Sequence, residues 1–210
     1  STQAEADAAS LMADNGNYFR GGDMHYVDQN GDHRIDSKDR VALGSAAPDF
    51  FGGFYTQFKY KGFALGAEFS YSKGNMAYNA VRNQLEGMNT LGNQSIAVLN
   101  RWSLDGQVTN MPRVQHNDPY RSTSFSERWL EDASYLRMKS VTLSYSFDKT
   151  VLNFFRSGTL YVSGENLLTA TKYLGLDPEF SYSYGETSQG LDYAKMVQPK
   201  SVKFGVNLKF

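Results

Sequence analysis

The residues best suited to chemistry lie in one acidic loop near the start of the chain. Counted from Asp28 as position one, oxygen donors fall at positions 1, 3, 5, 7, 9 and 12. The residues at these positions are Asp28, Asn30, Asp32, Arg34 (through its backbone carbonyl), Asp36 and Asp39. Oxygens at the spacing of an EF-hand-type loop are hard ligands that converge on Ca²⁺. The loop therefore predicts a calcium site with these six ligands.

Two departures from the EF-hand pattern leave a second interpretation open. His33 occupies the position where a glycine makes the sharp turn, and Asp39 replaces the longer, bidentate glutamate. The alternative is an Asx-rich turn around Asn30-Gly31 with solvated carboxylates.

The remaining residue types argue against catalysis. The chain has no cysteine and only three scattered histidines, and it contains no nucleophile elbow, phosphate loop or zinc-ligand spacing. A glycosidase needs only a pair of carboxylates, which no motif test addresses. We expect no enzyme and no catalytic residues. The net charge of −1, without a basic cluster, also argues against nucleic acid as a partner.

The elements that position these residues are predicted to be strands in which polar and apolar side chains alternate. The last ten residues show this pattern best. Their odd-numbered positions are polar or glycine, and five apolar residues share the other face: Val202, Phe204, Val206, Leu208 and Phe210. A soluble antiparallel sheet buries such a face, whereas an outer-membrane β-barrel turns it toward lipid. Aromatic residues make up 14% of the chain, which is typical of membrane-interface girdles and of sugar-binding surfaces.

The same alternation predicts four further strands, at about 51–60, 63–72, 135–147 and 159–168. Lys61-Gly62 forms the two-residue turn of a hairpin, and the phase of the pattern shifts near Lys139-Ser140, which indicates a bulge or the exit from a bilayer.

The connections between the strands differ sharply in length. We expect residues 1–50 to form an extracellular loop that holds the acidic loop and a short helix capped by Thr2 and Glu5, ending near Asn15-Gly16. Long loops are expected at 73–133 and 170–199. Short turns on one side and long loops on the other indicate an outer-membrane barrel. Five strands cannot close a barrel in lipid, and the chain begins with Ser1 without a signal peptide, so we expect a piece of a larger barrel.

Large side chains in the long loops are candidates for ligand or partner contact, by stacking on sugar faces or seating peptide side chains. They are Trp102, Tyr120, Arg121, Trp129, Tyr173 and Tyr182. The alternative for each is packing within its own loop.

Several separate blocks resemble the SusC/RagA family of TonB-dependent outer-membrane transporters. They are the run from Gly22 through the acidic loop, Arg128 to Tyr145, Leu160 to Thr169, Tyr173 to Pro178 and Gln198 to Phe210. The resemblance covers about residues 21–210.

The resemblance implies the last strands of a large, plugged barrel in the outer membrane of a Gram-negative bacterium. It also implies import of oligosaccharides or peptides, with a SusD-like surface lipoprotein, TonB and the N-terminal barrel and plug as partners. The alternative is a soluble, calcium-stabilised β-domain that binds carbohydrate.

Overall fold

We describe the chain from a computed structural model that covers residues 2–148, 156–180 and 189–210. The chain divides into two compact units. The first comprises Ser1–Gly44 and Asn79–Leu130, and the second comprises Ser45–Tyr78 and Glu131–Phe210. No helix among the described residues is long and apolar enough to cross a membrane.

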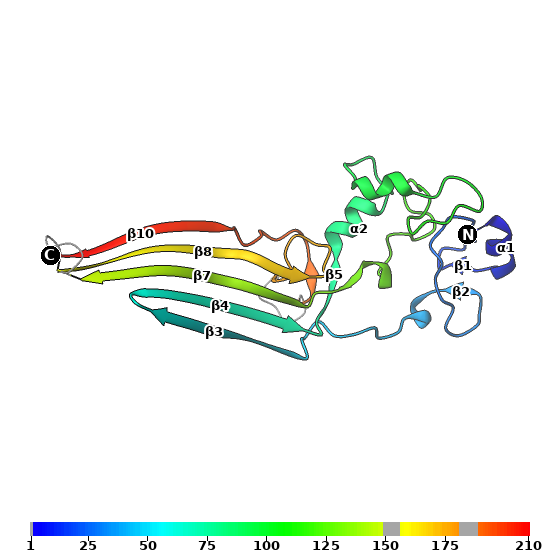
Figure 1. The fold of residues 1–210 in the computed structure, drawn as a ribbon. Coiled ribbons are helices and arrows are strands. Elements are labelled where there is room, and N and C mark those ends of the chain that lie inside the picture. Colours follow the sequence, from blue (N-terminus) through cyan, green and yellow to red (C-terminus); the bar gives the residue numbers. More distant parts are fainter. Residues whose placement is uncertain (1, 149–155, 181–188) are drawn as a thin grey trace. The chain divides into compact units, whose positions relative to one another are not determined.

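The second unit is built on a five-stranded antiparallel sheet with the strand order β10-β8-β7-β4-β3 (Figure 1). Its strands are β3 (Phe50–Tyr60), β4 (Phe63–Lys73), β7 (Tyr135–Asp148), β8 (Ser157–Thr171) and β10 (Ser201–Lys209). Every neighbouring pair is antiparallel. The prediction of an all-β fold with about five C-terminal antiparallel strands is confirmed.

The turn between β3 and β4 shows why this hairpin forms. Lys61 and Gly62 both have positive φ, 45° and 84°. A type I′ turn requires this combination, and its twist matches that of the two strands. Tyr60 therefore lies directly opposite Phe63, which sets the register of the whole hairpin.

A bulge keeps the apolar residues of β7 on one face. The register of β7 against β8 shifts between Met138 and Ser140, where the sequence pattern changes phase. Across the bulge, Leu136 and Met138 pair with Tyr71 and Phe69 of β4, as Leu143 pairs with Leu65. The extra residue thus restores Leu136 and Met138 to the common apolar face.

The regions expected as long loops contain structure of their own. The chain between β4 and β7 forms β5 (Met76–Asn79), α2 (Ala80–Glu86), η2 (Ile96–Asn100), η3 (Glu127–Trp129) and β6 (Leu130–Asp132). A small sheet has the order β6-β5-β9, where β9 is Leu191–Asp192. These elements are too short to show a periodic pattern, and Ala77, Ala133 and Tyr173 form the small core beside them.

The first unit holds α1 (Gln3–Ala9) and the parallel pair β1 (Met12–Ala13) and β2 (Arg34–Ile35), followed by η1 (Ser37–Asp39). Thr2 and Glu5 form the expected capping box. The helix ends earlier than expected, because Ser10 takes a left-handed conformation and its N–H bonds to Ala6 O. Met88, Val98 and Met111 form the core of the remaining part.

Candidate functional site

The apolar face of the five-stranded sheet is exposed. In β10, Phe204 keeps 81% of its surface accessible, and Phe210, just beyond the strand, keeps 83%. Val202, Val206 and Leu208 are exposed as well. On the neighbouring strands the rings of Phe54 and Phe69 stack with centroids 4.7 Å apart. An apolar surface of this extent marks contact with a partner or a membrane.

The opposite face of the same sheet is polar and hydrogen-bonded. The hydroxyls of Thr142 and Ser163 lie 2.8 Å apart across β7 and β8. Ser201 and Lys203 of β10 both donate to Glu165 of β8. One face of the sheet is therefore adapted to an apolar environment and the other to water.

The acidic loop holds its carboxylates through backbone amides. Asp28 Oδ1 accepts from the N–H of Gly31 at 2.8 Å, and its Oδ2 accepts from the N–H of His33 at 2.8 Å. Desolvation acts to raise the pKa of Asp28, but these and other backbone N–H donors outweigh it and lower the pKa. His33 has a φ of 59°, so the loop makes its sharp turn although the residue is not glycine.

The other acidic side chains of this loop are held in the same way. Asp32 Oδ1 accepts from Arg34 N–H, and Asp36 and Asp39 form a capping box around η1. Asn30 links to Asp32 through its amide. No group of three or more acidic, histidine or cysteine side chains in the described parts of the chain is arranged to hold a metal. The oxygen donors suit Ca²⁺ in kind, but in this structure they close an Asx-turn network.

Two of the candidate aromatic contacts are buried. Trp129 is 1% exposed, and the guanidinium carbons of Arg82 and Arg128 lie 5.4 and 5.0 Å from its ring centroid. Tyr173 packs in the core with Ala77, and its hydroxyl donates to Asp192 Oδ2 at 2.6 Å. A ligand could reach neither ring without displacing the residues that cover it.

The other four candidates have different surroundings. The ring of Trp102 lies against Gly22, where a Cβ would come within 2.4 Å of it. Tyr120 lies under the guanidinium groups of Arg20 and Arg113, at 6.0 and 4.9 Å. Arg121 pairs with an aspartate at 2.9 Å. Tyr182 is outside the described residues.

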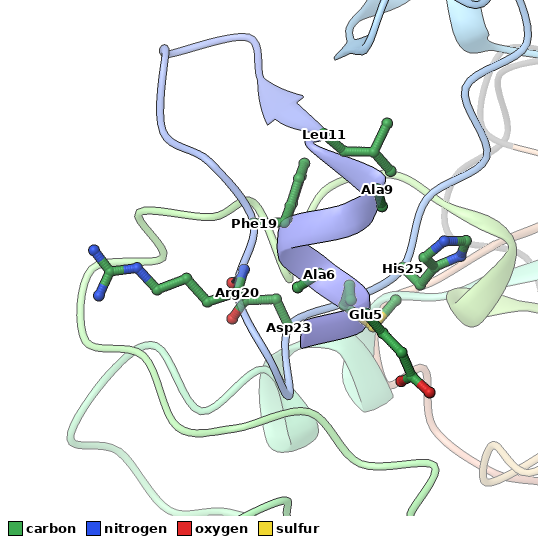
Figure 2. A pocket seen from close by; sticks show the side chains of 9 residues that line it. Glu5, Ala6, Ala9, Leu11, Phe19, Arg20, Asp23 and His25 are labelled. Atoms are coloured by element: carbon green, nitrogen blue, oxygen red, sulfur yellow. Dashed lines mark hydrogen bonds between the residues drawn. The ribbon is translucent and has the colours of Figure 1, made fainter. Parts of the chain in front are cut away.

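A pocket of about 400 Å³ lies beside α1 (Figure 2). Ala6, Ala9, Leu11 and Phe19 contribute its apolar lining. Asp23 also lines the pocket, but its carboxylate is already hydrogen-bonded within the protein. It accepts from Arg113 Nε at 2.5 Å and from a glutamine amide. The pocket is therefore mainly apolar, and none of the candidate metal-ligand or ligand-contact residues predicted from the sequence lines it.

A buried ion cluster in the second unit could not be predicted from the sequence. Arg137 of β7 is 3% exposed and pairs with Asp177 and Glu179. The paired residues are 40 or more positions apart in the chain, so no short sequence motif indicates that they meet.

The chain is similar in sequence to TonB-dependent receptors. It is 32% identical over 197 residues to TonB-dependent receptor P3 of Formosa agariphila, a match that covers 90% of this chain and 19% of the receptor. It is 26% identical over 188 residues to TonB-dependent receptor SusC of Bacteroides thetaiotaomicron, covering 88% of this chain and 17% of SusC. No family model matches the chain.

Solved structures agree with these sequence matches. The chain superimposes on the RagAB peptide importer in its closed-closed state with a TM-score of 0.70 and 26% identity, covering 95% of this chain and 20% of the matched chain. For the open-open state the TM-score is 0.68, with 28% identity, covering 90% of this chain and 21% of the matched chain. The chain thus spans about a fifth of the length of these proteins. The names of these relatives describe receptors and an importer, not enzymes.

Proposed function

We propose, from its similarity to TonB-dependent receptors and to the RagAB importer, that this chain forms part of the wall of an outer-membrane nutrient importer. The observation that carries the proposal is the two-faced sheet. Its apolar face is exposed along β10, and its other face is lined with hydroxyl and charged groups. Barrel strands in the outer membrane have this division between lipid and a polar interior.

The strand lengths support the same proposal. β3 and β4 have 11 residues each, which at about 3.3 Å per residue gives about 36 Å along the strand. Tilted by about 45°, such a strand rises about 25 Å, the height of the apolar band of an outer-membrane barrel. β3 and β10 are the edge strands of the sheet among the described residues, and their outer edges would then pair with further strands of the receptor, since an open edge in lipid leaves backbone groups unsatisfied.

The finer parts of the proposal concern cargo and partners. We propose import of oligosaccharides or peptides, and one of the similar solved structures is described as a peptide importer. The partners would be a SusD-like surface lipoprotein, the N-terminal barrel and plug of the same receptor, and TonB as the source of energy. Because the chain spans about a fifth of its relatives, these partners would act on the whole receptor.

Calcium binding by the acidic loop is a separate proposal. Asp28, Asn30, Asp32, Asp36 and Asp39 would supply side-chain oxygens and Arg34 a carbonyl oxygen, which is the ligand chemistry Ca²⁺ takes. A carboxylate oxygen has two lone pairs, so an oxygen that accepts one backbone N–H retains capacity for a cation. Bound Ca²⁺ would stabilise this loop.

The test uses the complete receptor in its native outer membrane. We expect it to require detergent for extraction, to co-purify with a surface lipoprotein, and to support TonB-dependent uptake of a labelled oligosaccharide or peptide mixture. A deletion of residues 201–210 should abolish insertion and uptake together. A protein recovered in the aqueous fraction that binds carbohydrate and Ca²⁺ would instead favour the soluble β-domain.

A further inference from the structure

The buried ion cluster beside β7 pairs Arg137 with two carboxylates from the chain between β8 and β10. All three nitrogens of the Arg137 guanidinium donate a hydrogen bond. Nε donates to Thr169 Oγ1 at 3.1 Å, Nη1 to Glu179 Oε2 at 3.0 Å and Nη2 to Asp177 Oδ1. An arginine with 3% exposure has few other partners available, so its charge depends on these two carboxylates.

Asp177 extends the cluster to two further parts of the chain. Its Oδ1 also accepts from the N–H of Glu179 at 2.9 Å, and its Oδ2 accepts from the N–H of Gln198 at 3.1 Å. One carboxylate, 7% exposed, therefore joins β7, the chain that follows β8 and the chain that precedes β10. Its position also has a local cause, since Pro178 restricts Asp177 to extended conformations.

The charges of the cluster balance. Lys139 Nζ lies 2.7 Å from both oxygens of Glu179. The two cations, Arg137 and Lys139, come from β7, and the two carboxylates come from the chain between β8 and β10. Moving that chain away would separate Arg137 and Lys139 from both counter-charges, and a buried charge is costly whenever it loses its partner. The cluster therefore favours the position in which residues 177–179 lie against β7.

We infer that Asp177, Arg137, Glu179 and Lys139 form a latch that fastens the base of the β8–β10 connection to β7. When the latch breaks, residues 177–180 and the chain just before β10 separate from β7, while the five-stranded sheet and the pairing of β9 with β5 persist. The sheet keeps its own backbone ladders, which do not involve the latch side chains. The latch thus sets the position of residues 177–180 and of the chain just before β10.

The test is limited trypsin digestion of the complete receptor in outer-membrane vesicles. Lys172, Lys195 and Lys200 are exposed and lie in the connection, outside the strands. We expect Asp177→Asn and Arg137→Gln each to accelerate cleavage at these lysines by at least tenfold, because cleavage follows the population of the open state. Glu165→Gln is the matched control. It breaks the exposed pair with Lys203 on the sheet itself and should leave the cleavage rate unchanged.

Two further measurements separate a latch from a general loss of folding. Hydrogen exchange should accelerate at residues 177–180 and 193–198 in the two latch variants and stay slow in β7, β8 and β9. The double variant should cleave no faster than the faster of the two single variants, because both remove the same interaction. Cleavage at the wild-type rate, additive effects, or equal loss of protection throughout the sheet would each overturn the inference.

Discussion

An arginine placed on the apolar face of β10 is the most severe test of whether this face of the sheet meets lipid and the other face meets water. Phe204 lies near the middle of the strand and is 81% exposed, opposite Val162. If this face meets lipid, Phe204→Arg puts a charge near the bilayer midplane, which costs about 2–4 kcal/mol. That free energy lowers the folding equilibrium constant in a bilayer by about 30- to 700-fold, since 1.4 kcal/mol is a factor of ten.

The matched control places the same residue on the other face. Asn207 lies three residues further along β10, and its side chain projects from the polar side. Asn207→Arg should change the free energy of unfolding by about 0.5 kcal/mol or less. The assay is reversible guanidinium unfolding of the receptor in lipid vesicles, followed by tryptophan fluorescence. Equal destabilisation by the two substitutions, or a larger effect at Asn207, would refute the assignment of the faces.

Four further outcomes follow from the structure. Gly62→Val should cost more than about 1 kcal/mol, because Gly62 has a φ of 84° and an added Cβ would lie 2.7 Å from a carbonyl oxygen of β7; a full chemical denaturation curve measures it, and an unchanged midpoint would contradict it. Trp129→Ala should destabilise the receptor by about 3–5 kcal/mol, and Phe125→Ala, at an exposed position in the same unit, should cost far less in the same assay. Burial acts to raise the pKa of Asp177, but hydrogen bonds from Arg137 and two backbone N–H groups outweigh it, so its folded-state pKa is lowered. Its stabilising contribution is therefore complete above its unfolded pKa of about 3.9 and is lost as the pH falls through the lower folded value; Asp177→Asn should remove this part of the pH dependence of thermal unfolding, and an unaltered profile would contradict it. Ca²⁺ at 100 times its dissociation constant should stabilise the receptor by about 2.7 kcal/mol, and Asp32→Asn should reduce this gain; a melting temperature that does not respond to Ca²⁺ or to a chelator would exclude the calcium site.

The features predictable from sequence are those that neighbouring residues determine. Alternation placed the strands of the sheet, and the Lys61-Gly62 turn follows from two residues that can take positive φ. The bulge beside Lys139 is visible as a change of phase. The capping box at Thr2 is likewise local. The end of α1 was not predictable, because Ser10 adopts a left-handed conformation that usually requires glycine or asparagine.

The candidate site was less accessible to sequence reasoning, because burial depends on distant contacts. Tryptophan and tyrosine are common in ligand-binding sites, but both of these residues are buried in the protein. Trp129 packs against Arg82 and Arg128, and the hydroxyl of Tyr173 donates to Asp192. In the sequence, Arg137 looks like an ordinary residue on the polar face of a strand. Its two carboxylate partners lie about 40 residues later, so the sequence does not show that they meet. Composition cannot distinguish such packing from a binding surface.

A scan of spin labels along β10 tests the central claim most directly. The chain contains no cysteine, so single cysteines at positions 202–209 can be introduced into the complete receptor after any cysteine elsewhere is replaced. We predict that accessibility to oxygen, which concentrates in lipid, peaks at 202, 204, 206 and 208, and that accessibility to a water-soluble nickel complex peaks at 203, 205, 207 and 209. Equal access of the nickel complex to both sets, or protection of the apolar set from both reagents, would show that this face does not meet lipid.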